Sequence, residues 1–569
     1  MINNETMNKI YKKILELRTN PNYKARIHKI LLMLSVLLLL MISVYTSTQA
    51  SNLYTTNSDA IVDTYLFGRN FKLHQVTLPG QHSNILKIPL FYIQGHLPYH
   101  YTSFMLVNIG LALLTIGAWA LLLIKLFGRK YEIPILIILS NLILTSTMFN
   151  FSIAETTIRN IEYPIALWFI FVVDRLLKRT KYSHKELYFS IIGSILFCLV
   201  LSGDNFFEYV VLLPIMLVVL WYWIKSKKFT LELAKVIGLL TTVWIGAQLT
   251  RALLSSSGVV IFNKTFDYKT KILPYNNLWA SISTAFRQLM NLENANIFGR
   301  TVDAHNLDIF INFGILLVST VGLILLLRGA NYYKNKKNLT TPNDYTLRVI
   351  AVSYFMVFLV YILSGQVVQR LNNNQTVSLG QSRYIAFMPL LAIVGSVWIL
   401  KRYFDNHKRL HYFLLSILLI NMLVAYPSVI NAYKSDLQSM QPSRKSLANV
   451  IQILKKDGVS EVVTGYWYGS SLRFWSHNTI KFAPEIGCNE PFNYNYRTSW
   501  LTPQKNIRSA LIVDHNGPDA SFWPCTNNQL INIYGRPAKQ QTAVGSTSGT
   551  YISIWVYNYD VRQKLLPIN

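Results

Sequence analysis

Two aspartates stand out in the stretch that follows the first long apolar segment. Asp59 and Asp63 are four residues apart, so a short helix would place both carboxylates on one face. Two carboxylates held close together raise the pKa of one of them, which favours general-base catalysis or the binding of a divalent metal such as Mg²⁺ or Mn²⁺. The alternative is a pair of solvated loop aspartates, one of which caps a helix. The spacing is compatible with both readings.

A second set of charged residues flanks two predicted turns on the same side of the chain's apolar segments. Glu155, Arg159 and Glu162 surround one turn, and Asp204 and Glu208 surround another. Acidic side chains at membrane depth are unfavourable unless they face a polar cavity. We therefore predict that these groups converge near Asp59 and Asp63. The alternative is that they are surface charges at the ends of membrane helices.

The third feature is the pair Arg383-Tyr384, which leads into a late apolar segment. The planar guanidinium of an arginine can hold a phosphate through two parallel hydrogen bonds. Arg383 is therefore a candidate for binding a lipid phosphate. An Arg-Tyr pair is also an ordinary anchor at a membrane–water interface, and the sequence does not separate the two roles.

Several common catalytic motifs are absent from the sequence. It contains no Walker A loop, no G-x-S-x-G, no H-E-x-x-H and no CxxC, which argues against an ATP-driven pump. His82, His96 and His100 lack metal-ligand spacing and are interpreted as polar loop residues.

The elements that must position these residues are membrane-spanning helices. Apolar residues make up 51% of the chain and charged residues only 14%, whereas soluble domains carry about a quarter charged residues. Apolar blocks of 17 or more residues can cross a hydrocarbon core of about 30 Å. The sequence predicts about eleven spans, near 30–47, 103–124, 133–149, 161–177, 187–202, 209–224, 234–250, 306–327, 347–364, 384–400 and 411–430.

Charge orients these spans. With the basic leader 1–29 in the cytoplasm, every predicted inner segment has more Lys and Arg than Asp and Glu, and together these segments hold most of the net charge of +28. This is the positive-inside pattern, and it explains the high net charge without a nucleic-acid partner. The predicted location is a bacterial inner membrane, with the N-terminus cytoplasmic and the C-terminus extracytoplasmic.

Three longer regions fall on the outer side: 48–102, 251–305 and 431–569. The last is predicted to be a small α/β domain, in which Ser443 caps a helix that runs to Lys456. Strands are expected at 459–464, 509–513 and 551–557. Its aromatic residues at 466–468, 474–475 and 494–496 could stack on sugars or form a core. Cys488 and Cys525 could form a disulfide if the domain faces an oxidising compartment.

The layout resembles the GT-C superfamily of membrane glycosyltransferases, in particular the bacterial branch related to protein mannosyltransferases and lipid A aminoarabinose transferases. Asp59 and Asp63 stand where that family has its acidic motif, although many members have adjacent acids. Arg383-Tyr384 followed by Pro389 is similar to the Arg-Tyr that opens a late span in these enzymes, and residues 82–94 are similar to the interfacial segment after the acidic motif.

The resemblance implies a GT-C-like transmembrane domain over 30–430 that transfers a sugar from a polyprenyl-phosphate donor at the outer membrane face. The acceptor would be a glycan, a lipid or a protein. Asp59 would act as the general base, with inversion at the anomeric carbon, and Asp63 would orient the acceptor or bind a metal. Arg383, Arg159 or a metal would hold the donor phosphate.

Three alternatives remain open at this point. The chain could be an oligosaccharide ligase or polymerase, since those enzymes have similarly long outer loops. It could be a lipid or solute transporter or flippase, although paired half-molecules are not visible in the sequence. It could also be a scaffold without catalytic activity, in which case the outer carboxylates would not converge in a cavity.

Overall fold

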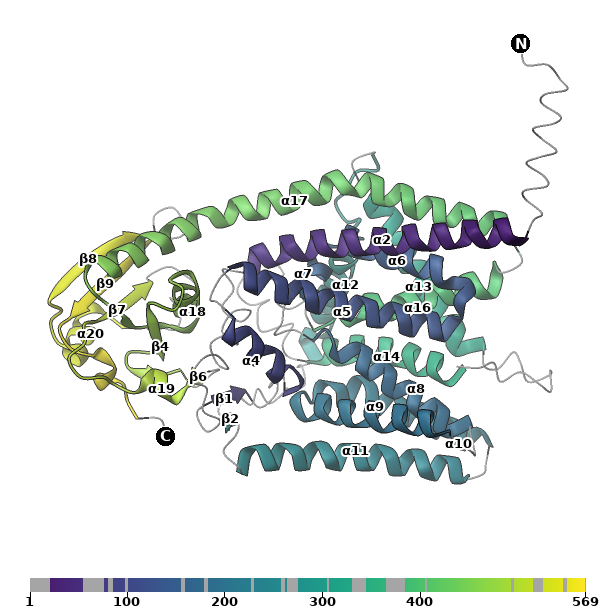
Figure 1. Ribbon diagram of the computed structural model, residues 1–569, viewed down its shortest axis with the longest axis horizontal. Helices are drawn as coiled ribbons and strands as arrows, with labels where there is room; N and C mark the ends of the chain where they lie inside the picture. The colour runs from purple at the N-terminus through teal and green to yellow at the C-terminus, as the bar shows by residue number, and fades with distance from the viewer. Residues whose placement is uncertain are drawn as a thin grey trace, which may run out of the picture.

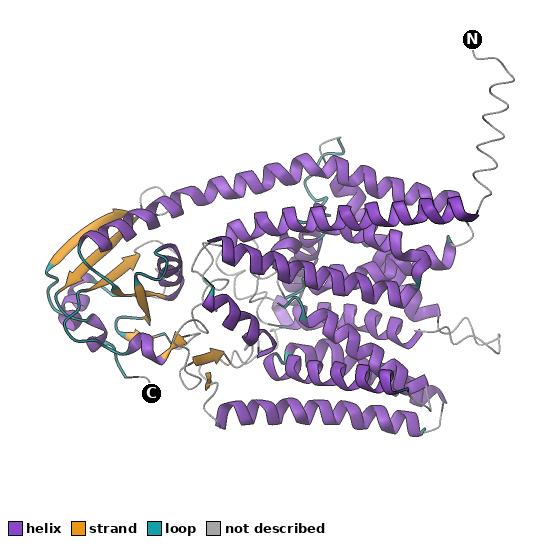
Figure 2. Ribbon diagram, in the orientation of Figure 1, coloured by secondary structure: helices purple, strands orange, loops and turns teal. Residues whose placement is uncertain are grey.

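The computed structural model describes most of the 569-residue chain. The described residues are 21–54, 76–79, 85–97, 101–154, 159–178, 183–226, 230–256, 261–263, 275–303, 306–329, 344–364, 384–404, 407–492, 496–514, 525–545 and 550–567. They form a bundle of long helices with a β-sheet domain at one end (Figures 1 and 2). Helix α2 begins at the opposite end of the bundle from that domain (Figure 1).

Within the described residues, seven helices are long and apolar enough to cross a membrane. They are α2 (Pro21–Tyr54), α5 (Tyr101–Phe127), α9 (His184–Gly203), α11 (Leu231–Ser256), α13 (Leu307–Gly329), α14 (Asp344–Leu363) and α17 (Lys408–Lys456). Apolar helices of this length satisfy all their backbone hydrogen bonds internally, as a hydrocarbon environment requires. The chain is therefore a multi-pass helical membrane protein.

Four shorter helices fill the remaining predicted spans: α6 (Glu132–Thr145), α8 (Glu162–Lys178), α10 (Leu213–Ser226) and α16 (Phe387–Tyr403). Each of the eleven predicted intervals is thus largely helical in the structure, and the number that cross the membrane remains a prediction. The predicted span 133–149 is divided at Ser146, where the chain leaves α6 and starts α7 (Thr147–Ala154). Helix α10 is preceded by one π-helical turn, Glu208–Leu212.

Helix α17 overturns one local prediction. Ser443 does not start a new helix, because α17 runs without interruption for 49 residues and contains Pro427 and Pro442. The helix is continuous because residues before and after Ser443 are both buried against other elements. Val429 and Tyr433 pack against Leu53 of α2, and residues 447–454 contribute to the core of the β-sheet domain.

The C-terminal domain is built on a six-stranded sheet in the order β5-β4-β3-β7-β9-β8. Strands β3 (Glu461–Gly465), β4 (Lys481–Ile486) and β7 (Ser509–Asp514) are parallel, whereas β5 (Glu490–Pro491), β8 (Lys539–Val544) and β9 (Tyr551–Tyr557) pair antiparallel with their neighbours. Helices α18 (Tyr466–Trp475) and α20 (Asn527–Tyr534) belong to the same domain (Figure 1). The small α/β domain is therefore present, with strands at all three predicted places.

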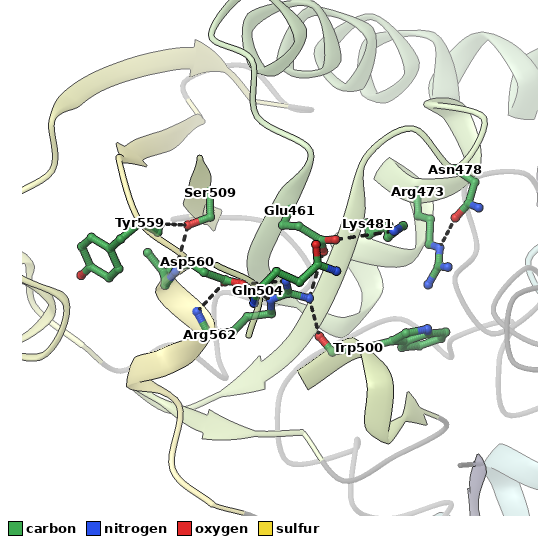
Figure 3. A network of polar contacts seen from close by, with 11 residues as sticks. Glu461, Arg473, Asn478, Lys481, Trp500, Gln504, Ser509, Tyr559, Asp560 and Arg562 are labelled. Atoms are coloured by element: carbon green, nitrogen blue, oxygen red, sulfur yellow. Dashed lines mark hydrogen bonds and ion pairs between the residues drawn. The ribbon is translucent and has the colours of Figure 1, made fainter. Parts of the chain in front are cut away.

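Two further features stabilise this domain. Cys488 and Cys525 form a disulfide, which fits a domain in an oxidising compartment. Figure 3 shows a polar network in which Arg562 pairs with Glu461 at 3.1 Å and with Asp560 at 2.7 Å. All three side chains are buried, so the network anchors the end of the chain to β3 through compensated charges.

The expected aromatic surface is partly a core. Tyr466 and Phe474 are buried, and the Phe474 ring contacts Phe104 of α5 with 5.5 Å between centroids. The Phe474–Phe104 contact links the C-terminal domain to the helix bundle. A three-stranded sheet provides a second connection between them and consists of β1 (Val76–Pro79), β2 (Ile261–Asn263) and β6 (Tyr496–Arg497). This sheet brings together one strand from each of the three outer regions and so attaches the domain to the membrane bundle.

Helices α13 and α16 approach each other closely through glycines. A Cβ atom on Gly322 would collide with the carbonyl of Gly395, and one on Gly395 would collide with the carbonyl of Ser319. Small residues permit such backbone contacts between membrane helices, where apolar surface alone gives little driving force. Ser319 and Ser396 are hydrogen-bonded at the same contact.

Gly322→Ala is expected to lower the free energy of unfolding by about 1–3 kcal/mol, because the new methyl group would have to displace backbone. Gly314→Ala on the same helix is the matched control, since a Cβ there has no atom within 4 Å, and alanine is the better helix former. Thermal melting of both variants in detergent tests the difference. Equal melting temperatures would contradict the close approach.

Glu485 on β4 provides a pH-dependent test of the C-terminal domain. It is 2% exposed, and its Oε1 accepts a hydrogen bond from the Tyr534 hydroxyl at 3.0 Å. Burial raises the pKa of Glu485 well above its usual value. The neutral Glu485 side chain therefore contributes its full stability to the fold below the unfolded-state pKa, near 4.3. That contribution is lost as pH rises through the folded-state pKa, because the unfolded chain can ionise while the buried carboxyl cannot do so easily.

Glu485→Gln should remove this loss, because the amide oxygen keeps the Tyr534 bond and carries no charge. The wild type should become less stable than the variant by up to about 1.4 kcal/mol for each pH unit above the unfolded-state pKa. Melting of the full chain between pH 5 and 9 measures the difference. Glu490→Gln, on an exposed position of the adjacent strand β5, should track the wild type. A pH-independent difference between wild type and Glu485→Gln would refute the assignment.

Candidate functional site

A group of charged side chains meets at the end of the bundle that faces the β-sheet domain. It is built from the turn Arg159–Ile161 before α8, the first residues of α8, the last turn of α9, the short 3₁₀ helix η2 (Ile85–Lys87) and the residues before α16. These elements are far apart in sequence, and η2 packs against α9.

Arg159 and Asp204 form the first ion pair. The Arg159 Nη2 donates to Asp204 Oδ1 at 3.1 Å, and its Nε donates to Asp204 Oδ2. The two residues are 8% and 9% exposed. Asp204 directly follows α9, and its Oδ1 also accepts from the backbone N–H of Phe206 at 2.9 Å. The pair therefore has the bidentate, additionally hydrogen-bonded geometry that makes buried charges tolerable.

Lys87 and Glu162 form the second pair, with 3.1 Å between Nζ and Oε1. They are 2% and 5% exposed, so this pair is more deeply buried than the first. Glu162 is the first residue of α8, and its Oε2 accepts from the backbone N–H of Asn160 at 2.9 Å. An acidic residue at a helix N-terminus also interacts favourably with the helix dipole.

Aromatic rings pack beside Arg159 in this cluster. The guanidinium of Arg159 lies 4.2 Å from the ring centroid of Phe206 and 5.5 Å from that of Tyr384. Tyr163 is stacked on Phe387 with 3.9 Å between centroids. Within the described part of the chain, the buried hydroxyl of Tyr163 has no hydrogen-bond partner. The cluster thus combines fixed charges with apolar walls, which lowers the local dielectric constant and strengthens electrostatic interactions.

Glu208 makes a separate contact. It is half-buried and accepts a hydrogen bond of 3.3 Å from Gln248 of α11. Arg251, one turn further along α11, donates to the carbonyl of Ser202 at 2.6 Å. Glu208 therefore ties the π-helical turn before α10 to α11.

The structure brings together four of the residues predicted from the sequence: Arg159, Glu162, Asp204 and Tyr384. Asp59, Asp63, Glu155 and Arg383 lie outside the described residues, so their predicted convergence with this cluster remains a prediction. Sequence reasoning did not single out Lys87. The available signal was one lysine inside the apolar stretch Ile85–Leu90, because a lone charge in such a stretch is retained only if it finds a partner.

The described residues contain no cluster of three or more His, Cys, Asp or Glu side chains able to hold a metal ion. Asp59 and Asp63, the candidate ligands for a divalent metal, lie outside the described residues. The described cluster has two cations and two carboxylates, and its formal charges cancel. Such a cluster can bind an anionic group through the two cations while its carboxylates hold those cations in place.

No protein-family model matches the chain, and no curated protein matches it. Among solved structures, the chain is similar to one described as the crystal structure of ArnT from Cupriavidus metallidurans in the apo state, at 10% sequence identity. The similarity covers 96% of this chain and 100% of that chain, with a TM-score of 0.34.

The Lys87–Glu162 pair can be tested through stability. Lys87→Met should lower the free energy of unfolding by about 3–5 kcal/mol, because it leaves a buried carboxylate without its cation. Lys87→Met combined with Glu162→Gln should recover most of the loss, since both buried charges are then removed. Thermal melting of the single and double variants measures the coupling.

The matched control is Lys185→Met, at an exposed position at the start of α9, which should change stability by less than about 0.5 kcal/mol. If the double variant melts below Lys87→Met, the two side chains are not an energetically coupled buried pair.

Proposed function

We propose that this protein is a membrane glycosyltransferase that moves a sugar from a polyprenyl-phosphate donor to an acceptor at the outer face of the membrane. The observation that carries the proposal is the pair of buried ion pairs, Arg159–Asp204 and Lys87–Glu162, at the bundle end next to the β-sheet domain. Buried cations held in place by carboxylates are suited to a phosphate that enters from the lipid phase. The resemblance of the chain's layout to GT-C enzymes supports the same proposal.

Lys87 and Arg159 are proposed to contact the donor phosphate, together with Arg383. An ammonium has three donor hydrogens, so Lys87 can contact a phosphate oxygen while it keeps its bond to Glu162. Arg159 uses Nε and Nη2 for Asp204, so its contribution is mainly a fixed positive charge. Both cations stabilise the negative charge that develops on the leaving phosphate.

Asp59 is proposed to act as the general base. It removes the proton from the acceptor hydroxyl, whose oxygen forms a bond to the anomeric carbon while the bond from that carbon to the phosphate oxygen breaks. The polyprenyl phosphate leaves with the electron pair, and the configuration at the anomeric carbon inverts. Asp63 orients the acceptor. Positioned proton removal of this kind accelerates reactions by about 10²–10⁴-fold.

Transfer can be measured in proteoliposomes that contain the purified chain and a panel of polyprenyl-phosphate sugars labelled in the sugar. Appearance of the label in the acceptor, with loss of the labelled donor, reports transfer. A flippase would instead change the leaflet in which the donor lies without breaking any bond, so the same assay separates these two functions.

Asp59→Asn should reduce kcat by about 10²–10⁴-fold with little effect on KM, because it removes the base and leaves donor contacts in place. Asp303→Asn is the matched control, at an exposed position in the outer segment between α12 (Leu278–Leu292) and α13, and should keep wild-type rates. The proposal is wrong if Asp59→Asn and Asp63→Asn both transfer sugar at wild-type rates.

The double variant Lys87→Met/Glu162→Gln tests the phosphate site in a folded protein. Loss of a hydrogen bond to a charged group corresponds to about 1.5–3 kcal/mol, or a drop in kcat/KM of roughly 10–150-fold. Wild-type kcat/KM in a normally folded double variant would exclude Lys87 from donor binding.

A further inference from the structure

A second polar region lies inside the bundle, separate from the paired cations. The outer halves of α6, α13 and α16, together with the turn that follows α12, line a small cavity of about 20 Å³. A volume of this size holds about one water-sized particle. Its polar lining consists of Asn141, Thr145, Glu293, Asn312, Ser319 and Ser396.

Glu293 is the charged group of this cavity. It is 9% exposed, and its Oε1 has no hydrogen-bond partner within the described ranges. The backbone around Glu293 is fixed by local contacts. The N–H of Glu293 donates to the carbonyl of Leu289 at 3.2 Å, and the next residue, Asn294, adopts a φ of 49°. The side chain of Asn294 donates to Asp308 at 3.0 Å. The carboxylate is therefore held at the cavity by a rigid turn.

The neutral oxygens of the cavity are also held in place. Nδ2 of Asn421 on α17 donates to Oδ1 of Asn141 at 2.9 Å and to Oδ1 of Asn312 at 2.8 Å. Each amide oxygen has a second lone pair. Ser319 and Ser396 are hydrogen-bonded across the α13–α16 contact. Polar side chains from four helices thus converge where the surroundings are otherwise apolar.

We infer that this cavity is a binding site for one small monovalent cation, sodium in particular. A carboxylate oxygen in a low-dielectric interior is unfavourable without a compensating charge, and one cation of single charge neutralises one carboxylate. Hard cations prefer oxygen ligands such as carboxylates, amides and hydroxyls. Glu293 is the single charged side chain among the residues that line the cavity, and one carboxylate balances a monovalent rather than a divalent ion.

Protons compete for the same oxygen. Glu293 lies in the turn outside the spanning helices, and burial raises its pKa to about 8. The neighbouring titratable groups are Asp308, bonded to Asn294, and Tyr354 of α14, whose hydroxyl is 3.2 Å from that of Thr320. Sodium binding should therefore weaken as pH falls, by about tenfold for each pH unit below the pKa of Glu293.

The test uses the full chain in nanodiscs, with melting temperatures measured in NaCl and in choline chloride at equal ionic strength. At pH 8.5 the melting temperature should rise with sodium and saturate, and the half-saturating concentration should be about tenfold higher at pH 6.5 than at pH 7.5. Glu293→Gln should abolish the sodium dependence. Glu232→Gln on α11, a partly exposed carboxyl, should retain it.

Binding of ²²Na⁺ to the wild type provides an independent measurement, which does not require any variant to fold. About one ion per chain, displaced by unlabelled sodium and by acid, would support the site. Equal melting temperatures in sodium and choline, or a dependence on pH without one on sodium, would overturn it. So would an equal sodium effect in Glu293→Gln. None of these outcomes depends on whether the protein transfers sugar.

Discussion

A side chain that leaves water keeps its charge only if a counter-charge goes with it, and the outer end of this bundle follows that constraint. Arg159 has Asp204, and Lys87 has Glu162, with every member of the two pairs nearly inaccessible to solvent. The pairs hold together elements that are not neighbours in the chain: η2, the turn before α8 and the end of α9. A cation that is fixed in this way can meet an anionic ligand without first losing its water.

Backbone hydrogen bonds between strands attach the β-sheet domain. Outer loops that carry polar backbone need partners, and the sheet β2-β1-β6 supplies them by pairing strands from three separate regions. The continuous helix α17 adds a rigid connection, because its first half packs in the bundle and its last turns pack in the domain. The domain is therefore positioned over the bundle end that holds the two ion pairs (Figure 1).

Within the bundle, polar groups and small residues, rather than apolar burial, determine which helices pack against each other. Apolar side chains distinguish poorly between a lipid and another helix. Two contacts require one particular helix as partner, which a leucine contact does not. They are the glycine contact between α13 and α16 and the two asparagines bridged by Asn421. Glu293 is the one member of this region that carries a formal charge among the residues lining its cavity, which is why a cation is the expected occupant.

The sequence by itself determined the helices, because apolar length is a local property: each of the eleven predicted intervals is largely helical. Strands β7 and β9 also lie at the predicted places, 509–513 and 551–557. It also identified Arg159, Glu162, Asp204 and Tyr384 as candidates. Only the tertiary structure decided their partners, since ion pairs depend on which helix ends meet. For that reason Lys87 was missed, and Ser443 was wrongly expected to start a helix that long-range packing makes continuous.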